Sequence, residues 1–198
     1  MSPQTAIELK QLGIGEKIRS LRTAKKMGLD ALAKKLGVSK ILLGQIEEDV
    51  IPPTVATLLN ISKILGVGID HFFSDVEQTG KFELTRADER LSVHHDDLPE
   101  PGKISYNYES LAYRLAKKHM EPFFVQFDVS PEEGESYSHD GEEFIHVIKG
   151  EIEVVLSGDR VRLNAGDSLY FYANVPHTIR GIGPEKPEAV IVLYPYSS

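Results

Sequence analysis

The hydrophobic pattern of this chain changes its period once, near residues 74–80, and this change constrains the fold more than any other feature. Before it, apolar residues recur at three- and four-residue steps, as on one face of a helix. After it, short alternating segments are separated by glycine-containing turns, which is typical of β-strands in a sandwich or small barrel. We therefore expect an all-α domain at 9–73, a linker with a leading strand over 81–85 at 74–104, and an all-β domain at 105–198.

The N-terminal domain is expected to contain five short helices joined by short turns, the last of them over 69–73. Ser39 and Thr54 are suited to begin the third and fourth helices, because their side-chain oxygens can accept a hydrogen bond from a first-turn amide. Gly37 is suited to end the second helix in a left-handed conformation. This pattern predicts a compact helical domain.

Short motifs in this domain recur at fixed spacings: Gly15-Glu-Lys-Ile-Arg-Ser-Leu-Arg22, Leu32-Ala33, Gly37-Val-Ser39, Gln45-Ile-Glu47, Pro53-Thr54 and Leu65-Gly-Val67. They resemble the helix-turn-helix domain of the phage-repressor-like (XRE-type) transcription regulators over about residues 10–75. The resemblance implies that the helix beginning at Ser39 enters the major groove of double-stranded DNA. We also expect a homodimer, or a higher homo-oligomer, that reads a palindromic operator.

The charge distribution fits a DNA-binding N-terminus. Residues 1–75 hold ten Lys and Arg against eight Asp and Glu, a net charge of +2, whereas residues 76–198 hold twelve against twenty-two, a net charge of −10, which together give −8. The resemblance implies base or phosphate contacts from Ser39, Lys40 and Gln45 and phosphate contacts from a basic face, namely Lys17, Arg19, Arg22, Lys25 and Lys26. Glu48 and Asp49 stand where family members commonly carry a basic residue and a glycine. The alternative is a vestigial helical domain with solvated lysines.

Two sequence motifs of the all-β domain together carry residues that can bind one metal ion. His139 and Glu143 precede Gly150, and His177 follows about thirty residues later. Two imidazole nitrogens and one carboxylate form a three-ligand set for a divalent transition metal such as iron, zinc, nickel or manganese. His146 has the opposite strand parity to Glu143, so we interpret it as a packing residue.

These spacings resemble the cupin superfamily, whose fold is a small double-stranded β-barrel, over about residues 105–195. Tyr137 stands where the first cupin motif normally has a histidine, so the resemblance implies His139, Glu143 and His177 as ligands with Tyr137 as a weak fourth. The alternative is a relic site in which both histidines are only hydrogen-bonded. The loop at 94–97 also carries two histidines and two aspartates, but adjacent loop side chains seldom converge on one ion.

A small-molecule effector is expected in the cupin domain. Arg114, other cationic residues and several tyrosines favour an anionic effector, although a solvated surface explains the cations equally well. The two-domain plan also resembles hydroxypropylphosphonate epoxidase, a mononuclear iron enzyme. Its substrate-binding lysine and tyrosines match Lys26, Tyr106 and Tyr108 here.

The leading prediction is a DNA-binding transcriptional regulator whose cupin domain senses a small molecule through a bound divalent metal. An iron(II) oxygenase or epoxidase is the alternative, so catalysis stays open, and a metal-free metabolite binder is a third interpretation. The chain has no cysteine, which excludes disulfides and thiolate metal sites. It has neither a signal peptide nor an apolar run of about 18 residues, so we expect a cytoplasmic protein without a membrane partner.

Overall fold

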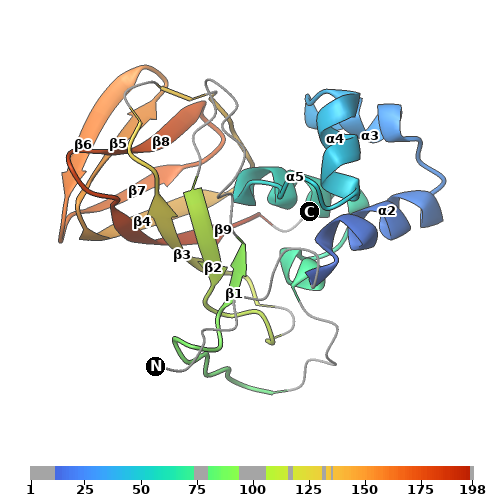
Figure 1. Ribbon diagram of the computed structural model, residues 1–198, viewed down its shortest axis with the longest axis horizontal. Helices are drawn as coiled ribbons and strands as arrows, with labels where there is room; N and C mark the ends of the chain where they lie inside the picture. Colours follow the sequence, from blue (N-terminus) through green and yellow to red (C-terminus); the bar gives the residue numbers. More distant parts are fainter. Residues whose placement is uncertain are drawn as a thin grey trace. The chain divides into compact units, whose positions relative to one another are not determined.

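The computed structural model describes residues 12–73, 80–93, 106–115, 118–130, 133–134 and 136–196. The chain divides into two compact units, called here the first unit (1–94 with 113–117) and the second unit (95–112 with 118–198). Figure 1 shows helices in the first unit and two sheets in the second. No helix in the described parts of the chain is long and apolar enough to cross a membrane.

The helical part of the first unit contains four α-helices in the described residues, and not the five that were predicted. The fifth predicted helix is a 3-10 turn, because the amides of His71 and Phe73 donate to carbonyls three residues earlier, not four. The elements are α2 (Ile14–Ala24), α3 (Leu29–Leu36), α4 (Lys40–Glu47), α5 (Val55–Leu65) and η1 (Ile69–Phe72). Their fully buried apolar side chains form one core, which includes Ile14, Ile18, Leu32, Leu43, Leu58 and Leu65.

The predicted helix ends are confirmed. The Ser39 side chain accepts a hydrogen bond from the amide of Leu42 at the start of α4, and Thr54 accepts one from Thr57 at the start of α5. Gly37 ends α3 with a φ of 71°, a left-handed conformation that glycine adopts at low cost. The turn between α3 and α4 is therefore encoded by local residues.

The close approach of α2 and α4 depends on Gly15 and Asp49. A Cβ atom added at Gly15 would lie 2.2 Å from the Ile46 carbonyl oxygen. The Gly15 amide donates a 2.7 Å hydrogen bond to Oδ1 of Asp49, whose φ is 52°. Residue 49 thus needs a conformation that glycine adopts readily and aspartate tolerates, and the Asp49 carboxylate binds the start of α2.

The segment over 81–85 does not form the strand that its alternation predicted; β1 spans Leu91–Val93. Phe82 is 84% exposed, and the apolar side chain of Leu84 is exposed as well. Instead, the Glu83 carboxylate accepts hydrogen bonds of 3.1, 2.8 and 2.8 Å from the backbone amides of residues 113–115. Glu83, the polar residue of the alternating segment, therefore anchors this segment to residues 113–115.

The second unit is built from two antiparallel sheets. In the larger sheet the strands of this unit lie in the order β2 (Tyr106–Ser110), β3 (Glu121–Phe127), β9 (Glu188–Tyr194), β4 (Glu142–Lys149) and β7 (Ser168–Tyr172). The smaller sheet has the order β6 (Asp159–Asn164), β5 (Glu151–Leu156) and β8 (His177–Ile182). Strict alternation of buried and half-buried residues along β3 defines an inner, apolar face of the larger sheet.

Candidate metal centre and DNA-reading surface

Three residues from two sheets converge in the second unit. His139 precedes β4, Glu143 lies near the start of β4, and His177 begins β8 in the other sheet. One ligand atom from each lies within 4.8 Å of the other two. All three residues are buried, and His177 is only 1% exposed. We call them the triad.

The hydrogen bonds of His177 set the direction of its lone pair. Nδ1 lies 2.8 Å from the carbonyl oxygen of Val175, an acceptor, so Nδ1 carries the proton and Nε2 presents a lone pair. Nε2 is buried, has no hydrogen-bond partner among the described residues, and lies 3.7 Å from Oε2 of Glu143. Burial lowers the pKa of His177 below its ordinary value, which favours the neutral ring that a metal requires.

The triad fits a divalent metal. Oε2 of Glu143 is also 3.3 Å from Nε2 of His139, so both imidazoles face the same carboxylate oxygen. The second ring nitrogen of His139 lies 3.4 Å from the carbonyl oxygen of Asp140, and this backbone support resembles that of metal-bound histidines. A cation between the three groups would satisfy the His177 lone pair and the buried charge of Glu143 together.

Tyr137, the predicted weak fourth ligand, packs against the triad. Its backbone exchanges two hydrogen bonds with His177, and the two ring centroids are 4.4 Å apart. Burial, followed by the charge of Glu143, raises the pKa of Tyr137 well above its usual range. The phenol is therefore neutral, which is the weaker form of a tyrosine ligand.

The predicted effector residues divide between the units. Tyr106 and Tyr108 lie on β2, where Tyr108 is fully buried and packs edge-on against Phe123. Lys26 and Arg114 belong to the first unit, so only the two tyrosines share the unit of the triad. The Arg114 guanidinium donates to the Tyr113 hydroxyl and to Glu89.

The N-terminal end of α4 presents the predicted base-reading residues. Ser39 and Lys40 are exposed, and Gln45 is half-buried. Lys40 also forms an exposed ion pair with Asp30 at 3.0 Å. Ile41 is an apolar residue that the sequence indicates as a poor base reader. Its side chain is nevertheless 76% exposed beside them and suits an apolar contact with a thymine methyl, whereas Leu43 and Ile46 lie on the buried face of α4.

The predicted phosphate-contacting residues differ in their availability. Lys17 donates weakly to the carbonyl of Phe72, and Arg19 is half-exposed with Glu47 and Glu48 at 3.6 and 3.9 Å. Arg22, in contrast, is held by Glu47 inside the domain. Arg22 therefore orients α4 and does not present a free guanidinium to DNA.

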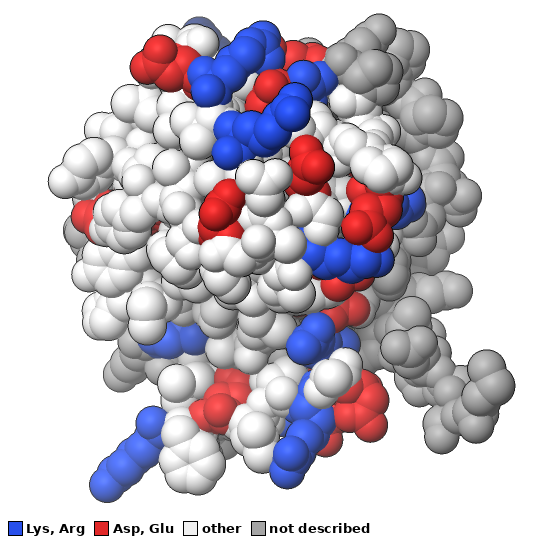
Figure 2. Space-filling view, turned by 90° about the vertical axis from the view of Figure 1, so that its left-hand side faces the viewer, with Lys and Arg blue, Asp and Glu red and all other residues white. Residues whose placement is uncertain are grey.

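The remaining histidine and the loop cluster are also placed. His146 lies within 2.9 Å of the Ser168 hydroxyl and is not part of the triad. Residues 94–97 lie outside the described residues. On the face shown in Figure 2, acidic and basic side chains stand beside one another around a broad uncharged area. Among the described residues, this face offers no extended basic patch to a phosphate backbone.

Comparison with known families confirms both domains. Residues 18–72 match the helix-turn-helix family, and residues 123–194 match the cupin domain. The HTH-type transcriptional regulator PuuR of Escherichia coli is 24% identical over 167 residues, which cover 84% of this chain and 86% of PuuR. The HTH-type transcriptional regulator SutR of Escherichia coli is 29% identical over 168 residues, covering 85% and 86%.

Solved structures share the two-domain plan. An HTH_3 family transcriptional regulator from Vibrio cholerae has a TM-score of 0.63 and 25% identity, covering 93% of this chain and 96% of that one. FeII HppE in complex with substrate has a TM-score of 0.51 and 22% identity, covering 92% and 98%. The second likeness concerns the fold alone.

Proposed function

We propose that this chain, which combines a helix-turn-helix domain with a cupin domain and is homologous to the PuuR and SutR regulators, is a transcriptional regulator that senses a small-molecule effector. The observation that carries the proposal is the similarity to regulators across both domains. DNA binding is assigned to the exposed N-terminal end of α4, with Ser39, Lys40 and Gln45 as reading residues and Lys17 and Arg19 as phosphate contacts.

Salt-dependent binding tests this assignment. Each phosphate contact that is removed reduces the slope of log affinity against log salt by about 1. We expect Arg19→Ala and Lys40→Ala to weaken binding to the protein's own upstream DNA, measured by fluorescence anisotropy between about 50 and 200 mM salt. Lys149→Ala is the matched control, because Lys149 is an exposed lysine of the second unit, paired with Glu185. Absence of salt-sensitive binding by the parent protein, with or without metal, would contradict the proposal.

The protein is proposed to act as a homodimer or higher homo-oligomer on a palindromic operator, with half-sites about 10 bp apart. Sedimentation of the free protein and its DNA complex measures both stoichiometries. A single chain on a single half-site would exclude the dimeric part of the proposal.

The cupin unit is proposed to hold a divalent metal through His139, Glu143 and His177, with Tyr137 beside them. The observation that supports it is the buried, unpartnered Nε2 of His177 facing a buried carboxylate. When bound, the metal supplies a Lewis acid that holds an oxygen donor of an anionic effector. Tyr106 and Tyr108 belong to the same unit and are proposed to line the effector pocket.

Elemental analysis of the purified protein tests metal binding. We expect one iron, zinc, nickel or manganese ion per chain, lost in His177→Ala and retained in His146→Ala, whose imidazole faces Ser168. If His139→Ala abolishes metal binding but leaves effector binding intact, the cupin unit is a metal-free metabolite binder.

A second candidate function is an iron(II) oxygenase or epoxidase. The favouring observation is that the triad provides three protein ligands, which leaves coordination positions for substrate and oxidant. Anaerobic iron(II) titration, followed by oxygen or peroxide with phosphonates or hydroxy acids, tests this function. Turnover that requires His177 would support catalysis, whereas absence of any iron-dependent spectral change or product would reject it.

A further inference from the structure

Strand β8 presents the triad on one face and a second polar group on the other. Successive side chains of a strand point to opposite faces, so Thr178 points away from the side occupied by His177. Thr178 pairs with Val155 of β5, and Arg180 pairs with Glu153 on the same outer face. The outer face of the smaller sheet is thus chemically separate from the metal centre.

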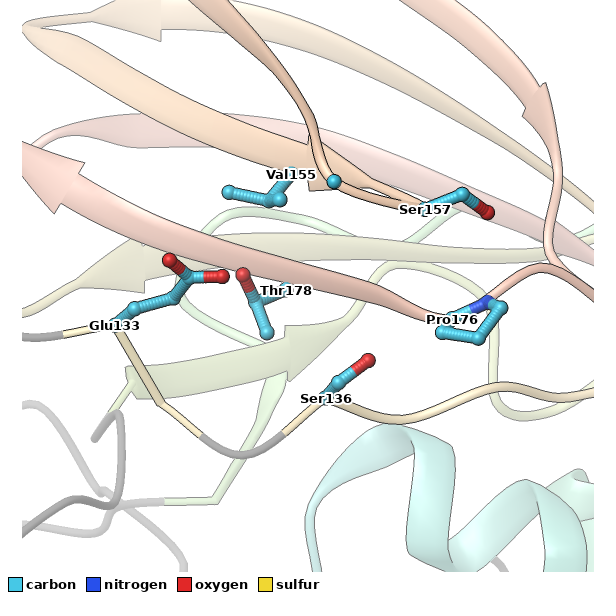
Figure 3. Close-up of a pocket in the computed structure, with 7 residues that line it drawn as sticks. Glu133, Ser136, Val155, Ser157, Pro176 and Thr178 are labelled. Atoms are coloured by element: carbon cyan, nitrogen blue, oxygen red, sulfur yellow. The ribbon is translucent and has the colours of Figure 1, made fainter.

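A cavity of about 460 Å³ lies on this outer face. Its lining includes Glu133, Ser136, Val155, Ser157, Pro176 and Thr178, with Ser157 in the turn after β5. Figure 3 shows Glu133, Ser136 and Thr178 pointing toward the same space. The volume falls within the range of small-molecule sites in proteins.

The Thr178 hydroxyl is the observation that points to a ligand. Thr178 is only 2% exposed, and its Oγ1 has no hydrogen-bond partner among the described residues. A buried hydroxyl without a partner is unfavourable, because it has lost water without gaining a protein contact. A ligand hydroxyl in the cavity would restore that hydrogen bond.

The charges around the cavity favour a neutral ligand. The Glu133 carboxylate is paired with Arg160, which also contacts Glu153 at 3.0 Å. Glu153 is in turn bound by Arg180 with a 2.9 Å hydrogen bond from Nε. Among the lining residues that the structure describes, none is cationic. An anionic ligand would therefore find no cationic side chain among these lining residues, and a cationic ligand would find the Glu133 carboxylate already paired with Arg160.

We propose that this cavity binds a neutral polyhydroxylated molecule, a polyol or monosaccharide, at a site distinct from the triad. Hydroxyls donate and accept, so Thr178, Ser136 and Ser157 can each match a ligand hydroxyl, and Glu133 adds an acceptor. Val155 and Pro176 provide apolar contacts for the C–H face of such a ligand. A ligand of this size and polarity binds with a Kd on the order of 1 mM or tighter.

The test uses the full-length protein and a defined panel of probes. Glucose, ribose and myo-inositol are the neutral probes, and gluconate and glucosamine are the charged ones. Binding is measured by saturation-transfer NMR with titration to about 20 mM, twenty times the expected Kd. We expect saturable binding of at least one neutral probe, weakened about tenfold by Thr178→Val and by Ser136→Ala through loss of one hydrogen bond each. Thr178→Ser keeps the hydroxyl and should retain binding.

Several outcomes would overturn the proposal. If no neutral probe shows saturable binding, the cavity holds water alone. Binding that survives both Thr178→Val and Ser136→Ala would also overturn the proposal, and so would a preference for a charged probe. Thermal unfolding of each variant verifies folding, so that loss of binding is not mistaken for loss of structure. Probe binding by the parent protein should be the same with and without EDTA, which separates this site from the proposed metal centre.

Discussion

Arg22 of α2 and Glu47 of α4 form a bidentate ion pair, with Nε–Oε1 at 2.6 Å and Nη2–Oε2 at 2.7 Å. Glu47 is only 3% exposed at its side chain, and the third guanidinium nitrogen of Arg22, Nη1, donates to the Met27 carbonyl at 2.8 Å. Hydrogen bonding to Glu47 raises the pKa of Arg22, so this guanidinium stays charged. The pair fixes α4, and hence the reading residues at its start, against α2.

Arg22→Met should destabilise the first unit by about 3 kcal/mol, because it leaves the Glu47 carboxylate buried with only the longer contact to Arg19. Urea unfolding followed by circular dichroism at 222 nm measures the change. Arg19→Met is the control; Arg19 is half-exposed, and its contacts with Glu47 and Glu48 are longer, so we expect a loss of about 1 kcal/mol or less. Equal losses in the two variants would show that the bidentate pair has no special role.

Gly15→Ala should be strongly destabilising, by about 3 kcal/mol or more, since the new methyl would overlap the Ile46 carbonyl and force α2 away from α4. Gly28→Ala is the matched control, because an added Cβ there meets nothing within 4 Å and the backbone has a φ of −70°. Thermal unfolding of both variants compares them directly. A Gly15→Ala protein as stable as Gly28→Ala would disprove the close helix contact.

The features that the sequence predicted well are local. The caps at Ser39 and Thr54 depend on the residue itself and an amide three positions later. The proximity of His139 and Glu143 follows from their four-residue separation. His177 lies in the opposite sheet, and it was predicted through the resemblance to cupins and not from local spacing.

The features that the sequence did not predict depend on distant partners. The alternation of Glu83 with Phe82 and Leu84 resembles that of a strand. In the structure Glu83 is instead anchored by amides about thirty positions away, which the local pattern does not reveal. The exposure of Ile41 depends on how α4 rotates about its axis, and the cavity beside Thr178 depends on a segment more than forty residues earlier. Periodicity carries no information about such contacts.

The Glu153–Arg180 pair should make the second unit sensitive to acid. The hydrogen bond from Arg180, together with the charge of Arg160, holds the pKa of Glu153 below its usual value. The stabilisation is therefore fully present above the ordinary glutamate pKa of about 4.3 and is lost as the pH falls through the lower, folded-state pKa. Glu153→Gln should reduce stability at pH 7 and flatten the acid limb of the stability curve.

Unfolding by urea at a series of pH values between about 2.5 and 7, a range that spans the ordinary glutamate pKa, measures this dependence. Glu185→Gln is the control, because its ion pair with Lys149 is exposed and screened by solvent, so we expect the acid limb of the parent. A Glu153→Gln protein with the acid limb of the parent would exclude this residue as a source of acid sensitivity.

Metal removal should destabilise the second unit. A metal that binds the folded state alone adds RT ln(1 + [metal]/Kd), about 2.7 kcal/mol at a hundredfold excess over Kd. We therefore expect chelation by EDTA to lower the Tm of the parent and of His146→Ala, and to leave the Tm of His177→Ala unchanged. An equal effect of EDTA on all three proteins would place the metal elsewhere.

Glu83 should control the protection of the segment that returns to the first unit. Its Oε2 accepts from the amides of Arg114 and Leu115, and its Oε1 from that of Tyr113. In Glu83→Gln the amide nitrogen cannot accept, so at least one of these amides loses its partner. We expect hydrogen exchange over residues 113–115 to rise about tenfold or more, equivalent to about 1.4 kcal/mol of local stability.

Glu89→Gln is the control for this change. The Glu89 carboxylate contacts the Arg114 side chain at 3.3 Å, and the Tyr113 hydroxyl donates to the Glu89 backbone carbonyl, which the substitution keeps, so the amides of 113–115 should stay protected. Residues 113–117 belong to the first unit, although the strands on either side, β2 and β3, belong to the second. The Glu83 contacts therefore fasten residues 113–115, which follow β2 in a loop where the chain returns to the first unit. If metal-dependent changes in DNA affinity persist unaltered in Glu83→Gln while exchange over 113–115 increases, the signal does not pass through this loop.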